Sequence, residues 1–156
     1  AEGLSEPGEL WVKGPNVMLG YLNNEQATAD TIDAEGYLHT GDMAQVDPTG
    51  CVYIVDRLKE LIKYKGYQVP PAELEALLLT HPKIADTAVI GVNDDDGEEI
   101  PKAFVVTQPD ADLDENEVIE FVAAKVAPHK KVRAVEFIDA IPKSASGKIL
   151  RKDLRK

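Results

Sequence analysis

The sequence changes character at residues 56–69, which read DRLKELIKYKGYQV. Upstream of this stretch, residues 9–13 and 51–55 are rich in the aromatic and β-branched residues that favour strands. The turn at residues 47–50 predicts that the segment beginning at Met43 pairs with the second of these strands as a hairpin. The first third of the chain is therefore expected to be mostly β.

A short helix is expected to interrupt this β-rich part, starting at Asn23 or Asn24 and continuing through Ala29. Downstream of residues 56–69 the pattern is mixed. Short strands are predicted on the two sides of Gly66, and Pro71 stands at the favoured first position of a helix. Three residues form the apolar stripe of that helix: Leu74, Leu77 and Leu78.

Two strands, a helix and a further strand are expected after this helix. Residues 87–92 and 103–107 are strand-like runs that flank an acidic loop and should pair antiparallel. A capping-box pattern at Asp114 and the periodicity after it predict a helix as far as Pro128. Residues 132–138 predict a last strand, followed by a Ser/Gly-rich loop and a basic terminal helix.

We therefore predict an α+β fold. Its main part is a small C-terminal domain of about 100 residues after Arg57, with an antiparallel β-sheet flanked by helices. The β-rich region before it is an incomplete structure.

Composition and charge exclude several classes of function. The 156 residues are 44% hydrophobic and 29% charged, as in ordinary globular proteins, and no apolar run approaches the roughly 20 residues that span a bilayer. The net charge of −11 would repel a phosphate backbone, so no nucleic-acid partner is expected. The single cysteine, Cys51, favours a reducing compartment such as the cytoplasm. Because the chain begins Ala1-Glu2-Gly3 without Met, it is expected to start inside a longer protein.

Residues 37–42, which read YLHTGD, form the first of three clusters with chemical potential. An aspartate after a glycine at a strand end, such as Asp42, can offer two carboxylate oxygens to a vicinal diol such as a ribose. A turn or capping aspartate fits the same pattern, and His39 in isolation is better explained by a packed polar residue than by a ligand or base. The cluster alone therefore leaves its function open.

The stretch at residues 56–69 is the second cluster. Arg57 can fork onto phosphate or ribose oxygens, and its lysines supply mobile point charges. Gly66 would let the backbone approach a ligand where a side chain would block it. A β-ribbon with a solvated basic face is the alternative interpretation.

Residues 142–151, which read PKSASGKILR, form the third cluster. Small residues place Lys148 at a loop tip, where its ammonium could neutralise charge that builds up on a carboxylate and a phosphate. The Gly-Lys pair also suggests a nucleotide-binding loop. However, the glycine spacing does not fit a P-loop and no strand-loop-helix core surrounds the pair.

The order of the motifs is more specific than any one of them. Residues 8–10 (GEL), Gly14 and residues 20–21 (GY) precede the three clusters, and the whole series closely resembles the closing motifs of the acyl-adenylate-forming superfamily. This superfamily includes acyl-CoA synthetases, luciferases and peptide-synthetase adenylation domains. The segment at residues 59–75 resembles the branch of 4-coumarate–CoA ligases and luciferases, because peptide-synthetase domains usually carry an Asp where Lys59 stands.

The resemblance implies the C-terminal part of an ATP-dependent carboxylic acid–CoA ligase. Such enzymes use ATP with Mg²⁺ to activate the acid as an acyl-AMP and then transfer the acyl group to the thiol of CoA. Between the half-reactions, a small C-terminal domain rotates against the large N-terminal domain and presents different faces to one active site.

Residue roles are implied where positions match the motifs of the family. Asp42 is expected to hold the ribose hydroxyls of ATP or AMP, and Arg57 the ribose or phosphate side. Lys148 matches the lysine that bridges the carboxylate and the α-phosphate during adenylation. Four residues are expected on the face used for thioester formation: Lys63, Lys65, Gly66 and Gln68. The pantetheine arm of CoA would pass beside the glycine, Lys63 would serve the transfer step, and no metal ligand is assigned.

The same resemblance predicts the domain organisation. Residues 1–56 would end the large N-terminal domain, residues 57–59 would be a hinge that includes Lys59, and residues 60–156 would form the mobile C-terminal domain. The phosphate loop and acyl pocket of the family lie upstream and have no counterpart here. The chain alone is therefore not expected to be active or to bind a cofactor tightly. Its expected partners are its own N-terminal domain, the carboxylic acid, ATP and CoA.

Two other functions stay open. A luciferase shares the segment at residues 59–75 and would emit light with luciferin and oxygen, whereas a ligase would consume CoA and release AMP. Alternatively, the chain is only a mobile binding and positioning module, which a comparison of AMP release by the chain and by the intact protein would reveal.

Overall fold

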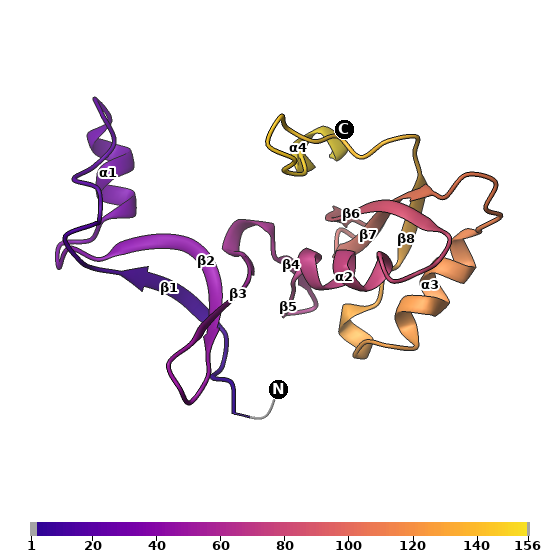
Figure 1. Cartoon of the computed structure of the whole chain (residues 1–156), viewed down its shortest axis with the longest axis horizontal. Coiled ribbons are helices and arrows are strands. Elements are labelled where there is room, and N and C mark those ends of the chain that lie inside the picture. Colours follow the sequence, from indigo (N-terminus) through magenta and orange to yellow (C-terminus); the bar gives the residue numbers. More distant parts are fainter. Residues whose placement is uncertain (1–2, 156) are drawn as a thin grey trace. The chain divides into compact units, whose positions relative to one another are not determined.

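The computed structural model describes residues 3–155, so Ala1, Glu2 and Lys156 lie outside the described range. The chain divides into two compact units, Ala1–Lys59 (unit 1) and Glu60–Lys156 (unit 2) (Figure 1). Among the described residues, no helix is long and apolar enough to cross a membrane.

Unit 1 contains a three-stranded antiparallel sheet. Its strands β1 (Gly8–Val12), β2 (Leu38–Val46) and β3 (Val52–Arg57) lie in the order β1-β2-β3. The predicted hairpin is confirmed, because Val46 pairs with Val52 across the turn at residues 47–50.

The described residues of unit 1, 3–59, contribute to neither of the two hydrophobic core clusters of the protein. Helix α1 (Glu25–Thr31) begins as predicted at Asn24, whose side chain caps the first turn, but it buries no residue. Among the described residues of unit 1, the buried hydrophobic ones are Met43 and Ala44, whereas large apolar side chains on the loops and strands face solvent. The most exposed of them are Leu19, Leu22, Ile54 and Tyr53.

Unit 2 is an α+β domain, as predicted. Its elements follow one another as β4 (Ile62–Tyr64), β5 (Tyr67–Val69), α2 (Pro71–Leu78), β6 (Ile84–Asn93), β7 (Glu99–Thr107), α3 (Glu115–Ala123), β8 (Ala134–Phe137) and α4 (Arg151–Leu154). Short 3₁₀ turns, η1 (Leu58–Glu60) and η2 (Pro128–Lys130), precede β4 and follow α3. Strands β4 and β5 form an antiparallel hairpin, and β6, β7 and β8 form a second sheet in that order.

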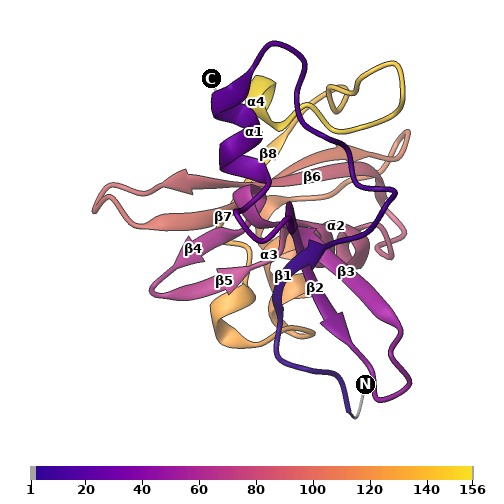
Figure 2. The same ribbon diagram turned by 90° about the vertical axis from the view of Figure 1, so that its left-hand side faces the viewer.

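The main sheet of unit 2 is covered differently on its two faces. Successive residues of a strand point to opposite faces of the sheet. Val89 and its neighbour Ile90 therefore belong to two different clusters of buried hydrophobic side chains, one on each face. Helices α2 and α3 cover one face, whereas the C-terminal segment with α4 covers the other (Figures 1 and 2). The first cluster contains the fully buried Leu74, Leu78, Val105, Val118 and Val122, and each such side chain contributes about 1.5–3 kcal/mol on burial.

Two details of unit 2 depart from a simple antiparallel pattern. The pair β6 and β7 is antiparallel as predicted, but β8 joins β7 in parallel, so the sheet is mixed. Helix α3 ends at Ala123 and not near Pro128. The residue before a proline avoids the helical region, and the chain instead makes η2 there.

Candidate functional site

The Asp42 and Arg57 side chains form an ion pair in unit 1. The two residues are opposite one another in the β2–β3 pairing, and Arg57 Nε lies 2.9 Å from Asp42 Oδ1. The exposed fractions of the side chains are 27% for Asp42 and 59% for Arg57, so both reach solvent. Arg57 ends β3, but Asp42 lies in the middle of β2 and not at a strand end as expected, because the strand continues through Gly41 and Asp42 to Val46. The carboxylate and the guanidinium lie side by side, where they can accept from hydroxyls and donate to phosphate oxygens.

His39 is packed in unit 1. Its ring stacks on Trp11 with 4.0 Å between centroids, and Nε2 lies 3.4 Å from Asp33 Oδ2. The backbone N–H of Tyr37, with a further contribution from His39, lowers the pKa of the Asp33 carboxyl below its ordinary value. These contacts fit a structural role in the turn before β2.

The β4–β5 hairpin carries the predicted thioester-face residues. Ile62 pairs with Val69 and both are fully buried, so the next pair, Lys63 and Gln68, is on the exposed side. The backbone N–H of Lys63 donates to Glu99 Oε2 at 2.8 Å, which ties the hairpin to β7.

The turn of this hairpin consists of Lys65 and Gly66. Both have positive φ, +47° and +83°, as a two-residue type I′ turn requires. A Cβ built on Gly66 would meet no atom within 4 Å, so the turn is open to its surroundings. The backbone of Gly66 is therefore accessible to an approaching ligand.

An aromatic and basic hollow of about 370 Å³ adjoins this turn. The Tyr67 ring stacks on His129 at 4.4 Å, and the Arg133 guanidinium lies 3.7 Å from the centroid of the Tyr64 ring. Lys65 also lines the hollow, but His129 and Arg133 were not identified from the sequence. In the sequence these two residues belong to a basic run after α3. The sequence of this run does not indicate that it contacts β5.

Lys148 lies on a hydrogen-bonded turn that Lys143 and Ile149 close through an isolated β-bridge. The backbone N–H of Ser144 donates to the Lys148 carbonyl at 2.8 Å, and the Lys148 N–H donates to Ser144 Oγ at 3.1 Å. Gly147 adopts a φ of +80° in the turn. The Lys148 side chain is exposed and its ammonium makes no hydrogen bond or ion pair within residues 3–155.

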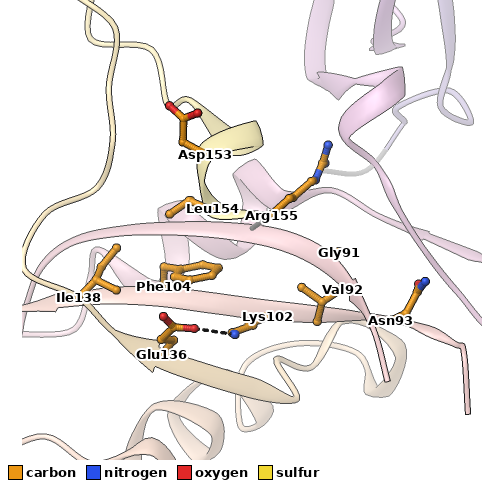
Figure 3. A pocket seen from close by; sticks show the side chains of 10 residues that line it. All are labelled: Gly91, Val92, Asn93, Lys102, Phe104, Glu136, Ile138, Asp153, Leu154 and Arg155. Atoms are coloured by element: carbon orange, nitrogen blue, oxygen red, sulfur yellow. Dashed lines mark hydrogen bonds and ion pairs between the residues drawn. The ribbon is translucent and has the colours of Figure 1, made fainter. Parts of the chain in front are cut away.

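Figure 3 shows a second hollow in unit 2, of about 510 Å³, beneath α4. Three of its four charged side chains form ion pairs, since Lys102 Nζ lies 2.7 Å from Glu136 Oε2 and Arg155 binds Glu60, whereas Asp153 is the fourth. None of the predicted site residues lines this hollow. It has no feature that selects one ligand chemistry.

The candidate residues occupy three places: the Asp42–Arg57 pair in unit 1, and the β4–β5 hairpin and the lysine turn in unit 2. Within residues 3–155, no group of three or more His, Cys, Asp or Glu side chains is placed to hold a metal ion.

Comparison with known proteins relates this chain to one family. Residues 73–148 match the model of the AMP-binding enzyme C-terminal domain. The 4-coumarate–CoA ligase-like 3 protein of Arabidopsis thaliana is 57% identical over 154 residues, which are 99% of this chain and 28% of that protein.

Solved structures show the same similarity. ATP-bound MatB from Rhodopseudomonas palustris superposes with a TM-score of 0.89 at 33% sequence identity. The matched region is 96% of this chain and 30% of the MatB chain. A second match is MenE from Bacillus subtilis, an o-succinylbenzoate CoA synthetase in complex with the acyl-adenylate intermediate OSB-AMP. Its TM-score is 0.87 at 35% sequence identity, and the matched region is 97% of this chain and 31% of the MenE chain. The chain thus spans less than a third of the length of these relatives.

Proposed function

The chain belongs to the AMP-binding enzyme family, as a homologue of the C-terminal part of 4-coumarate–CoA ligase-like proteins, and we propose that the whole protein is an ATP-dependent carboxylic acid–CoA ligase. It would convert an acid and ATP into an acyl-AMP and then transfer the acyl group to CoA. This chain would contribute the adenylation lysine and the thioester-forming face.

The observation that carries the proposal is the exposed, unpaired ammonium of Lys148 on a closed turn. An acid and a nucleotide phosphate each bring negative charge, and adenylation brings these charges together. A cation with no partner among the described residues is available to neutralise them, and a fixed turn reduces the reorganisation that this requires. Lys148 is therefore the proposed catalytic residue of adenylation.

The β4–β5 hairpin is the proposed face for transfer to CoA. Gly66 leaves room for the pantetheine arm, and Lys63 and Gln68 offer polar groups beside it. The adjoining hollow suits the nucleotide end of CoA, because Tyr67 and His129 offer ring faces to a base and Lys65 and Arg133 offer cations to phosphates.

The Asp42–Arg57 pair is proposed to bind the nucleotide of ATP or acyl-AMP. The carboxylate would accept from the ribose hydroxyls, and the guanidinium would donate to ribose or phosphate oxygens. Residues 1–56 would be the end of the large N-terminal domain, whose remainder would cover their exposed apolar side chains. Lys59 would be the hinge between this domain and the C-terminal domain.

The compartment of the protein is inferred from its cysteine. The lone Cys51 fits a reducing compartment such as the cytoplasm.

Separate assays of the two half-reactions in the full-length protein test the proposal. Lys148→Ala is expected to slow acyl-AMP formation by on the order of 10²- to 10³-fold, because one preorganised charge is lost. Transfer from supplied acyl-AMP to CoA should continue. Lys152→Ala is the matched control, since it removes another exposed lysine of the same C-terminal segment. Equal losses in both half-reactions of Lys148→Ala would contradict the assignment.

A further inference from the structure

Arg151 joins the lysine turn to two other elements of unit 2. It is the first residue of α4, and its Nη2 donates to both carboxylate oxygens of Glu75 on α2, at 2.7 and 2.8 Å. Its Nε donates to the carbonyl of Val89 on β6 at 3.4 Å. The exposed fractions of the side chains are only 17% for Arg151 and 11% for Glu75, so water screens this pair weakly.

Glu75 completes the connection from the other side. Its Oε1 also accepts a hydrogen bond from the backbone N–H of Val89 at 2.9 Å. One guanidinium and one carboxylate therefore fix α2, β6 and α4 together. Pairs in which an arginine and a carboxylate exchange charge-assisted hydrogen bonds restrict orientation as well as distance.

The other attachments of the lysine turn are less restrictive. Lys143 forms an ion pair with Asp86, but these side chains are 38% and 30% exposed. The backbone N–H of Leu150 donates to the Pro142 carbonyl at 2.8 Å, which closes the base of the turn upon itself.

Ile149 and Leu154 also pack against the apolar cluster on this face of the sheet, but such packing is not directional. Arg151 therefore adds the directional and weakly screened contacts that orient the turn relative to the sheet.

We propose that Arg151 and Glu75 are positioning residues that hold Lys148 in place for adenylation. This inference rests on the proposed catalytic role of Lys148. Because neither side chain extends from the turn itself, they would act through the backbone at the base of the turn and would not touch the substrates.

The test is a double-mutant comparison in the full-length protein. Arg151→Met is expected to lower the kcat of acyl-AMP formation roughly ten- to a hundredfold with KM unchanged, since misplacement by about 1 Å can cost ~10² in rate. Arg151→Lys should lose less, because the ammonium keeps the charge and can still donate to Glu75, although it lacks the planar fork of the guanidinium. In the Lys148→Ala background, Arg151→Met should cause no further loss, and transfer from supplied acyl-AMP should be unaffected throughout.

Glu73→Gln is the matched control. Glu73 lies on the same helix, α2, and both of its carboxylate oxygens bind Lys130 Nζ at 2.9 and 2.7 Å, away from the lysine turn. This change should leave adenylation unchanged, whereas Glu75→Gln should reproduce the defect of Arg151→Met. If Arg151→Met does not fold, Glu75→Gln and Arg151→Lys carry the same comparison.

The outcomes separate the two proposals. If the losses from Arg151→Met and Lys148→Ala multiply, or if both half-reactions fall together, the positioning role is wrong while the role of Lys148 stands. If Lys148→Ala alone adenylates at the parental rate, the proposed function is wrong and this inference fails with it.

Discussion

The turn formed by Lys65 and Gly66 has an unfavourable backbone conformation and lies in the proposed site for transfer to CoA. A residue with a side chain rarely adopts positive φ, and Lys65 does so at +47°. Sparsely populated backbone conformations of this kind are concentrated at functional sites. The turn thus places a cation and an open glycine backbone next to each other at the end of the hairpin.

Gly66→Ile should slow acyl transfer to CoA by at least about tenfold in the full-length protein, because the side chain would project into the open space that the thiol arm needs. Acyl-AMP formation should be spared. The positive φ also makes any side chain here unfavourable by roughly 1–2 kcal/mol. Pre-steady-state measurement of each half-reaction separates these effects on rate and stability.

Gly97 provides the control for Gly66. It has nearly the same φ, +82°, and equally open space, but it lies in the acidic loop between β6 and β7. Gly97→Ile should therefore show a similar loss of stability with normal transfer to CoA. If Gly66→Ile keeps its fold and transfers at the parental rate, the hairpin is not the thioester face.

The turn between β2 and β3 depends on one carboxylate, Asp47. Its Oδ1 accepts from the Thr49 hydroxyl at 2.6 Å and from the backbone N–H groups of Thr49 and Cys51, while the Tyr53 hydroxyl donates to Oδ2. The hydrogen bond from the Thr49 hydroxyl, followed by those from Cys51 and Tyr53, holds the pKa of Asp47 below its ordinary value. The charged carboxylate is therefore the form that the folded turn prefers.

This lowered pKa predicts how the hairpin responds to acid. A carboxyl whose pKa is lower in the folded state stabilises that state above its unfolded pKa of 3.8, and the contribution is lost as the pH falls through the folded pKa. An NMR titration should place the midpoint of Asp47 below 3.8. Asp47→Asn should remove this part of the acid dependence, and a midpoint at or above the ordinary value would contradict the assignment.

At the level of strands and helices, local patterns predicted much of the fold. Asn24 caps α1 as expected, and Asp114 Oδ1 accepts from the Glu117 N–H at 2.8 Å at the start of α3. The Glu117 carboxylate does not complete the capping box but binds Lys83, which is distant in sequence. The parallel addition of β8 also depends on packing between distant segments, which local periodicity does not determine.

In the candidate site, too, the contacts between residues far apart in the sequence could not be predicted from local patterns. Asp42 and Arg57 were identified separately, and only the hairpin register places them opposite one another. The contacts of His129 with Tyr67 and of Arg151 with Glu75 join segments far apart along the chain. No motif signals such pairs, because they depend on how helices and strands pack. The roles of all these residues in the reaction stay predictions.

The whole molecule divides between Lys59 and Glu60, and we propose the short turn η1 as the hinge between the two units. Lys59→Pro should fix φ at this position and remove a backbone donor. We expect acyl-AMP formation to continue, while transfer to CoA slows and the acyl-AMP accumulates. Lys59→Ala, which removes the same exposed side chain without fixing φ, should keep both half-reactions. Equal rates in both variants would argue against a hinge at Lys59.

Because β6 is an edge strand of the main sheet, the contacts with Glu75 and Arg151 occupy the backbone N–H and carbonyl of Val89, which would otherwise be open to another strand. An unpaired strand edge is a template for the strands of other molecules. Proteolytic removal of the C-terminal segment would uncover the Val89 carbonyl and the apolar face that Ile141 and Leu154 now shield. The clipped protein would then be prone to stack edge to edge into insoluble β-aggregates.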